Sequence, residues 1–255
     1  MSIDPRADRP VYQQIADVLR DAIVKGELTA GQKLPSERDL IERYGAARET
    51  VRRAIRVLMS EGRVESQRGV GVFVRQPGPP IRRMSMDRFA HRHRDTGKAA
   101  FAAEAEREGK PWRAEILELG EVEAPADIAL RLQLGEDPRA FVRRRRMWIE
   151  DYPMSLADSY FPLDIAEGTA IMREDSGPGG VHSRIEEQGI LLTRFEEELQ
   201  ARMPTPDEAH SLHLAPGVPV LDLVRTAYAG DRAVEILVSV AAGDKHVFHY
   251  AFPAE

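Results

Sequence analysis

The chain has 255 residues, 42% of them hydrophobic, and a formal net charge of −6. It contains no Cys, which excludes disulfides, thiolate metal ligands and cysteine nucleophiles and is compatible with a reducing cytoplasm. No stretch approaches the roughly 18 apolar residues of a membrane-spanning helix, so we expect a soluble, cytoplasmic protein.

The acidic net charge conceals a basic N-terminal part. Residues 1–76 carry a balance of +3, whereas the remainder carries −9. A basic balance confined to one part of a chain is typical of a nucleic-acid-binding domain. The charge therefore places any contact with nucleic acid in the first 76 residues.

Two helices are predicted near the N-terminus. Apolar side chains at helical spacing predict the first over residues 10–25. Ser36, with Asp39 three positions on, predicts the start of a short second helix because a Ser hydroxyl and an acidic side chain can cap each other's backbone amides. Gly45 ends this helix, since glycine accepts the left-handed conformation that follows many helices.

A third amphipathic helix is predicted over residues 47–60, and glycines within residues 64–75 predict a two-stranded wing. A short helix, a tight turn and a second helix form the geometry that lays one helix in the DNA major groove. Arg48 and Arg52 lie at the leading end of the third helix and are candidates for reading base edges, because Arg can bond guanine in bidentate fashion. The alternative is a helix face merely solvated by arginines. The other candidate DNA-binding residues are Lys33, Ser36, Arg38, Glu49, Thr50, Arg53, Arg68, Gly69 and Gly71.

Four stretches of this region resemble a known family. They are PVYQQI (10–15), GQKLPSERDL (31–40), TVRRA (50–54) and RGVGVFV (68–74), and they are similar to the N-terminal domain of GntR-type bacterial regulators. The resemblance implies a winged helix-turn-helix that binds double-stranded DNA. The family residues that contact DNA fall on Arg38, Arg48, Arg52 and the wing residue Gly69, while Ala47 stands where many members have Ser or Thr.

A break in regular structure is predicted at residues 76–80, where prolines lack amide donors. We expect a first domain over 1–76, a linker over 77–98 that continues into a helix within 82–108, and a second domain over 99–255. Predicted strands of the second domain are 113–122, 140–149, 154–161, 218–228 and 233–240, and predicted helices are 126–132, 182–188 and 194–203. The fold class is therefore α+β.

Four consecutive arginines begin at Arg143, within a strand-like run. Alternate residues of a strand share a face, so Arg144 and Arg146 point one way. Arg143 and Arg145 point the other way. An inward-facing pair needs partners, and an anionic ligand would supply them. The alternative is a salt-bridged outer surface, just as Glu235 in a later apolar strand could face outward.

The second domain also resembles a known family. Residues 153–162, 179–181, 184–189 and 212–221 are similar to the UTRA effector domain of HutC-like regulators. The resemblance implies a chorismate-lyase-like fold, an antiparallel sheet with helices, that binds small ligands without acting on them. The choice between the two arginine pairs stays open. The resemblance places the family's ligand contacts on Arg144, Arg146, Ser159, Tyr160 and Glu235, and Arg184 is a further candidate effector-binding residue.

No metal or cofactor is predicted. His91 with His93, and His210 with His213, form pairs that lack a third ligand. The glycine-rich residues 177–180 could cradle a phosphate ahead of a helix, although glycine turns before helices are common.

Together these patterns predict a homodimeric repressor that binds a palindromic operator and responds to a small-molecule effector, with an anion favoured by the arginines. Two other classes of protein are alternatives. One is an enzyme acting on its ligand, for which no paired acid and base is apparent. The other is an architectural DNA-binding protein without an effector.

Overall fold

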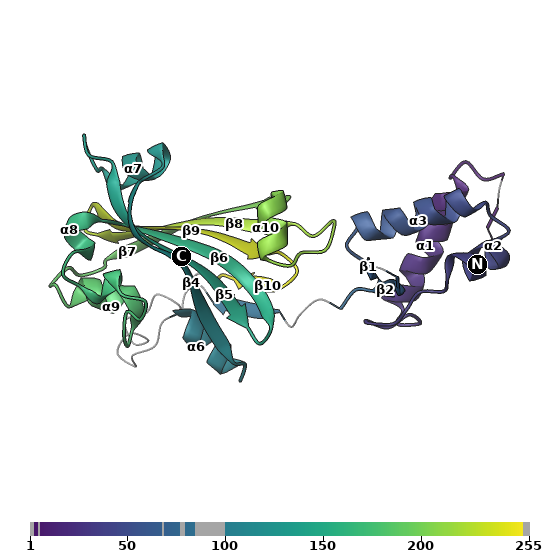
Figure 1. Cartoon of the computed structure of the whole chain (residues 1–255), viewed down its shortest axis with the longest axis horizontal. Coiled ribbons are helices and arrows are strands. Elements are labelled where there is room, and N and C mark those ends of the chain that lie inside the picture. The colour runs from purple at the N-terminus through teal and green to yellow at the C-terminus, as the bar shows by residue number, and fades with distance from the viewer. Residues whose placement is uncertain (1–2, 5, 68, 77–79, 85–99, 252–255) are drawn as a thin grey trace. The chain divides into compact units, whose positions relative to one another are not determined.

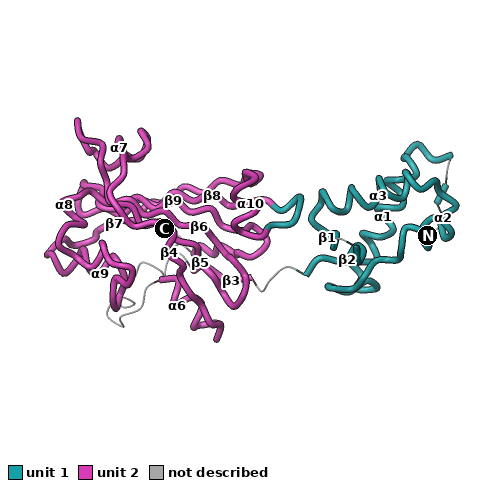
Figure 2. Tube along the Cα trace, viewed as in Figure 1, with its two compact units in different colours: residues 1–77, 214–218 teal, residues 78–213, 219–255 magenta. Residues whose placement is uncertain are grey.

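The computed structural model describes residues 3–4, 6–67, 69–76, 80–84 and 100–251. The chain divides into two compact units (Figure 2). Unit 1 comprises residues 1–77 and 214–218, and unit 2 comprises residues 78–213 and 219–255. No helix among the described residues is long and apolar enough to cross a membrane.

Unit 1 is a helical domain with a hairpin (Figure 1). Its elements are α1 (Val11–Val24), α2 (Glu37–Tyr44), α3 (Arg48–Ser60), β1 (Val64–Gln67) and β2 (Gly71–Val74). The strands β1 and β2 pair antiparallel, as predicted for the wing. The hydrophobic core between the helices and the hairpin contains Ile15, Leu19, Leu40, Val51, Ile55, Leu58, Val64 and Val74.

Local signals explain where α2 begins and ends. The Ser36 side chain accepts a hydrogen bond from the Asp39 amide, and the Asp39 carboxylate accepts one from the Ser36 amide, so the predicted reciprocal cap is present. Gly45 adopts the left-handed conformation with φ of 58° and ends the helix. The turn to α3 is therefore short, and it holds α3 beside α2.

The loop before α2 contributes a third strand-like segment to the wing. The Leu34 amide donates to the Val72 carbonyl at 2.8 Å, and the Gly31 amide donates to the Val74 carbonyl at 2.9 Å. This backbone pairing places Lys33 opposite Phe73. The sequence interpretation missed the pairing, because two or three residues of a loop carry no strand periodicity.

Unit 2 is built on a six-stranded sheet with strand order β4-β5-β6-β9-β8-β7. Every neighbouring pair in it is antiparallel. The strands are β4 (Trp112–Glu123), β5 (Arg139–Ile149), β6 (Tyr152–Pro162), β7 (Arg194–Arg202), β8 (Val220–Ala229) and β9 (Arg232–Ala242). A separate parallel pair joins β3 (Ile81–Met84) to β10 (His246–His249).

Helices cover both faces of this sheet. They are α6 (Ala100–Arg107), α7 (Ala126–Leu132), α8 (Leu163–Ala166), the 3-10 turn η1 (Ala170–Met172), α9 (Gly180–Glu186) and α10 (Pro206–Ser211). Ile128 and Leu132 of α7 pack with Val142 and Tyr160 on one face. Ile165 of α8 and the end of α9 pack with Phe141 on the other face, and Figure 1 shows α7 and α9 on opposite sides of the sheet.

Two sequence expectations for this half are corrected. Residues 194–203, predicted as a helix, form β7, which pairs along its length with β8. Partial burial alternates at the start of β7, where Phe195 and Glu197 are less exposed than their neighbours, and pairing with β8 outweighs the helical propensity of a Glu-rich segment. The expected linker, 77–98, includes β3, which belongs to unit 2 through its pairing with β10. Of the expected helix within 82–108, α6 is present, while residues 85–99 lie outside the described part, together with His91 and His93.

Candidate functional site

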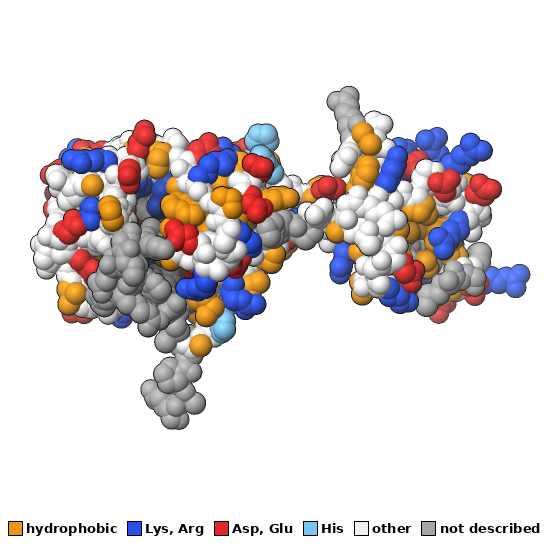
Figure 3. Space-filling model, turned by 90° about the horizontal axis from the view of Figure 1, so that it is seen from below, with side chains coloured by type: hydrophobic (Ala, Val, Ile, Leu, Met, Phe, Trp, Pro, Cys, Tyr) orange, Lys and Arg blue, Asp and Glu red, His pale blue; other side chains and the backbone are white. Residues whose placement is uncertain are grey.

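The N-terminal end of α3 presents the predicted base-reading arginines to solvent. The side chains of Arg48 and Arg52 are 73% and 54% exposed. Thr50 lies between them and is partly buried. Ala47 occupies the N-cap position without a side-chain hydrogen bond, so the first amides of α3 are not capped by that residue. Figure 3 shows basic side chains standing out from the surface of unit 1.

Glu37 of α2 accepts hydrogen bonds from both arginines. Its Oε2 accepts from Arg48 Nε at 3.2 Å, and its Oε1 accepts from Arg52 Nε at 3.1 Å. Each guanidinium uses only Nε for these bonds, so Glu37 leaves the Nη groups unengaged. Glu37 was missed in the sequence interpretation, although its place one residue after the Ser36 cap puts it at the start of the helix that packs against α3.

The remaining DNA-binding candidates occupy different settings. Arg38 is exposed on α2, while the hydroxyl of Ser36 is already engaged in capping. Arg53 stacks over the ring of Tyr12 of α1, with its guanidinium carbon 3.9 Å from the ring centre. The exposed carboxylate of Glu49 pairs with Arg56.

Lys33 and the glycines form the wing surface. Gly69 has φ of +75° and Gly71 has φ of +145°, conformations that favour glycine at both positions. A Cβ at Gly71 would lie 2.6 Å from Lys33 Cε, so the lysine side chain crosses close over the wing backbone. Arg68 lies outside the described residues.

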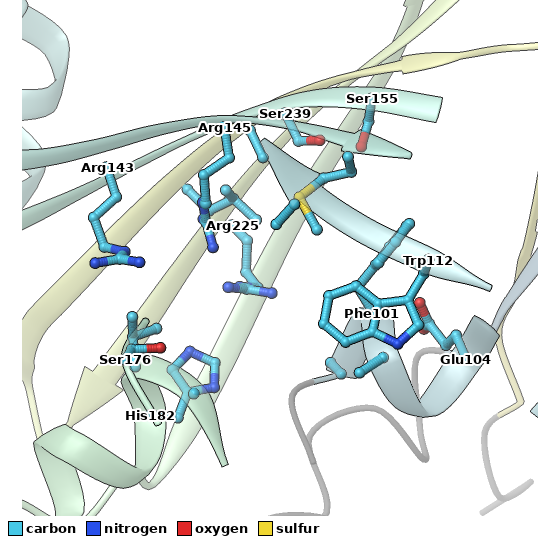
Figure 4. A pocket seen from close by; sticks show the side chains of 18 of the residues that line it. Phe101, Glu104, Trp112, Arg143, Arg145, Ser155, Ser176, His182, Arg225 and Ser239 are labelled. Atoms are coloured by element: carbon cyan, nitrogen blue, oxygen red, sulfur yellow. The ribbon is translucent and has the colours of Figure 1, made fainter. Parts of the chain in front are cut away.

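Unit 2 encloses a cavity of about 260 Å³ on the face of the sheet that carries α9 (Figure 4). Arg143 and Arg145 project into it from β5. Arg225 from β8, Glu235 from β9 and His182 from α9 complete its charged end. Charged groups from three strands and a helix therefore meet on one face.

The arginine pair in the cavity is not the pair that the family resemblance indicated. Arg144 forms ion pairs with Glu118 at 2.8 Å and Asp158 at 3.2 Å, and it is absent from the cavity lining. Arg146 binds Glu115, whose two oxygens lie 2.8 and 2.9 Å from its nitrogens. The strand register decides this, because a shift of one residue exchanges the faces of every side chain.

Three other candidate effector-binding residues lie in different settings. Tyr160 packs in the core beneath α7, on the opposite face of the sheet from the cavity. Arg184 donates to the carbonyls of Ser176 and Pro178, both at 3.2 Å, so it braces the loop beside the cavity instead of lining it. Ser159 is fully buried on the cavity face and accepts a hydrogen bond from Arg145 Nη2 at 2.6 Å.

Glu235 is the buried carboxylate of the charged end, with 1% of its surface exposed. Its Oε2 accepts from Arg225 Nη2 at 3.1 Å and lies 2.8 Å from His182 Nε2. Burial opposes ionisation, but Arg225 and His182 outweigh it and hold the pKa of the Glu235 carboxyl well below its usual value. Glu235 is thus an anion that balances Arg225.

Arg143 and Arg145 have no such carboxylate among the described residues. Arg143 donates to the carbonyls of Ile171, Arg173 and Glu174, which fixes its guanidinium at the cavity wall. Burial lowers the pKa of Arg143, against the attraction of Glu235. Burial and the neighbouring Arg143 lower the pKa of Arg145 to about 10. Both remain protonated at neutral pH. The cavity lining also includes Glu174 and Asp175, but both are exposed. Among the described residues of the charged end, three arginines therefore face a single buried carboxylate, that of Glu235.

The other end of the cavity is less polar. Phe101 of α6 and Trp112 of β4 meet edge to face there, with ring centres 6.1 Å apart. The sequence interpretation singled out neither aromatic residue, nor Arg225 or His182. A lone Arg225 in the apolar strand β8, like Glu235 in β9, was the available signal for a buried charge pair.

Both parts of the chain match models of known families. The model for bacterial regulatory proteins of the gntR family matches residues 11–74, and the UTRA domain model matches residues 107–247. An HTH-type transcriptional regulator of Streptomyces coelicolor is 32% identical over 250 residues, which are 95% of this chain and 93% of that relative. The HTH-type transcriptional repressor NagR of Bacillus subtilis is 28% identical over 98% of each chain.

Two further matches concern the fold and the subgroup. The crystal structure of a GntR-family transcriptional regulator superposes with a TM-score of 0.70 at 29% identity, covering 97% of this chain and 99% of that one. The histidine utilization repressor of Pseudomonas aeruginosa is 25% identical over 93% of this chain and 89% of the relative.

Proposed function

Because this chain belongs to the GntR family of bacterial transcriptional regulators and carries a HutC-type UTRA domain, we propose that it is a homodimeric repressor whose operator affinity is lowered by an anionic effector. The observation that carries the proposal is the pair Arg143 and Arg145, which faces the cavity of unit 2 and forms no ion pair with a carboxylate among the described residues. NagR and the histidine utilization repressor are both named as repressors, which supports the direction of regulation. Because the proposed target is operator DNA of a bacterium, we also propose that the protein acts in the cytoplasm.

In this proposal α3 reads the operator. The Nη groups of Arg48 and Arg52 bond guanine edges in the major groove, each good pair contributing about 1 to 3 kcal/mol of discrimination. Arg38, Lys33 and the wing contact phosphates and supply salt-dependent affinity. A dimer places two copies of α3 on half-sites about one helical turn apart, so the operator is an inverted repeat.

The effector acts through differential affinity. An anion in the cavity releases DNA only if it binds the DNA-free form more tightly, and coupling of about 1 to 3 kcal/mol corresponds to a change of roughly 5- to 150-fold in operator affinity. A ligand that bound both forms equally would change nothing.

The test is selection of bound duplexes from a random library at one stated salt concentration. We expect the native protein to enrich an inverted repeat and Arg52→Ala to lose that enrichment. The control Arg139→Ala removes an exposed arginine of unit 2 and should enrich the same repeat. Salt-sensitive binding without enrichment would contradict sequence-specific operator recognition.

A further inference from the structure

The cavity of unit 2 has two ends of different chemistry. Figure 4 shows Arg143, Arg145, Arg225 and His182 grouped at one end, and Phe101 with Trp112 at the other. Together they enclose about 260 Å³, a space for one small organic molecule. A ligand that spans the cavity therefore contacts cationic groups at one end and aromatic side chains at the other.

The charged end suits a single anionic group. Glu235 already balances Arg225, and the carboxylates of Glu174 and Asp175 are exposed. The guanidinium groups of Arg143 and Arg145 are therefore left without a buried carboxylate partner among the described residues. Arg143 is fixed by three carbonyls, so the position of its charge is set before a ligand arrives. A carboxylate or similar group bound between these two arginines would recover the electrostatic energy that burial costs them.

Two small hydroxyls also line the cavity. Ser155 of β6 and Ser239 of β9 project into it from adjacent strands, and they are 6% and 5% exposed. They can hydrogen-bond one polar atom of a ligand. They cannot match the many hydroxyls of a sugar.

The far end offers apolar contact. Phe101 packs against the cluster of Met147, Ala157 and Leu237, and its ring meets Trp112.

Two charged residues also line this end. Arg83 is engaged by Glu197 in an ion pair with both side chains buried. The second is Glu104, whose side chain is buried. The apolar surface of Phe101 and Trp112 is unfavourable to sugar hydroxyls, which would lose their hydrogen bonds to water there.

We propose that the effector is an organic monoanion with an apolar ring or short acyl body. Its charged group lies between Arg143 and Arg145, and its body lies against Phe101 and Trp112. This inference rests on the proposed function, because it assumes that the cavity is the effector site.

The first test measures by calorimetry how tightly the full chain binds probes that carry the same single negative charge and differ in the rest of the molecule. The probes are 3-phenylpropanoate, octanoate and gluconate, with glucose 6-phosphate as a polar anion of higher charge. We expect 3-phenylpropanoate and octanoate to bind with a Kd at least about tenfold lower than gluconate, because their bodies bury apolar surface. Equal or tighter binding of gluconate or glucose 6-phosphate would overturn the inference.

Matched variants test each end separately. Arg145→Gln should weaken 3-phenylpropanoate about tenfold or more, whereas Arg144→Gln, on the opposite face of the same strand, should not. Phe101→Ser should weaken 3-phenylpropanoate about tenfold and leave gluconate unchanged. Leu130→Ser, which alters an exposed leucine of α7, is its control. Thermal unfolding of each variant identifies any that fail to fold, and octanoate binding to the variants that fold gives a second measurement.

The outcomes separate the two proposals. Tight binding of the polar anions that depends on Arg145 would agree with an anionic effector site. It would refute the inference that the effector has an apolar body. Binding of apolar anions that is unchanged in Arg145→Gln would refute the placement of the charged group. If none of the four probes binds, both the anion site and this inference are wrong.

Discussion

Arg52 donates its Nε hydrogen to Glu37 Oε1 at 3.1 Å, so an arginine of the exposed face of α3 is oriented by the helix before it. The same carboxylate binds Arg48. A side chain that is held in one geometry loses less rotamer freedom on binding, and the Glu37 charge also opposes unselective contact with phosphate. In the proposed operator contact, the pairing would therefore favour sequence discrimination over affinity.

Glu37→Gln should tighten binding to random duplex and reduce the preference for the operator. The change removes a negative charge near DNA and loosens both arginines, and we expect the operator preference to fall by about 1 kcal/mol. Fluorescence anisotropy at one salt concentration measures both affinities. Glu42→Gln, an exposed change elsewhere on α2, is the control, and an unchanged ratio in Glu37→Gln would contradict the orienting role.

Arg53→Ala should leave the choice of operator sequence intact. Its guanidinium stacks over Tyr12, 3.9 Å from the ring centre, and joins α3 to α1. We expect a modest loss of stability, about 0.5 to 1 kcal/mol for an exposed cation–π contact, and no change in the enriched repeat. Urea unfolding and duplex selection measure the two effects. Loss of the repeat would show that Arg53 reads bases after all.

Glu235→Gln should strongly destabilise unit 2. It leaves Arg225 buried without the carboxylate it pairs with, and breaking a buried pair costs about 3 to 5 kcal/mol. The same substitution at Glu198, whose ion pair with Arg131 is largely exposed, should cost about 0 to 1 kcal/mol. Urea unfolding compares the two variants, and similar losses would show that the Glu235 pair is not desolvated as the structure indicates.

Stability should fall in acid partly through Glu115. Hydrogen bonds from Arg146, and a further one from Trp148, lower the pKa of Glu115 from 4.5 to about 2 against the effect of burial. A depressed folded-state pKa gives stability that is complete above pH 4.5 and is lost as the pH falls towards 2. The free energy of unfolding of Glu115→Gln should therefore depend less steeply on pH in this window. An identical slope would contradict the pKa shift.

The helices and the wing of unit 1 were predictable because their signals are local. Ser36 and Asp39 cap α2 through hydrogen bonds that span three residues, and Gly45 ends it by its own conformation. The apolar stripe of α3 repeats every three or four positions. None of these features needs a distant partner, so a short window of sequence contains the cause of each.

The sheet of unit 2 contains an element that no short window of sequence predicts. Residues 194–202 have side chains that suit a helix, and only the long pairing with β8 makes them β7. The backbone pairing that makes this segment a strand joins residues about 20 to 35 positions apart, from Arg194 with Tyr228 to Arg202 with Val220. No local sequence pattern contains such a pairing.

The sequence by itself determined the helices and the wing of unit 1, most strands of unit 2 and the exposed arginines of α3. It also showed that the four consecutive arginines alternate between the two faces of one strand. The tertiary structure decided that Arg143 and Arg145 face the cavity, because the faces covered by α7 and α9 depend on strand register across the sheet. It also decided that Arg225, Glu235 and His182 meet there, since buried charges find partners by spatial neighbourhood and not by spacing along the chain.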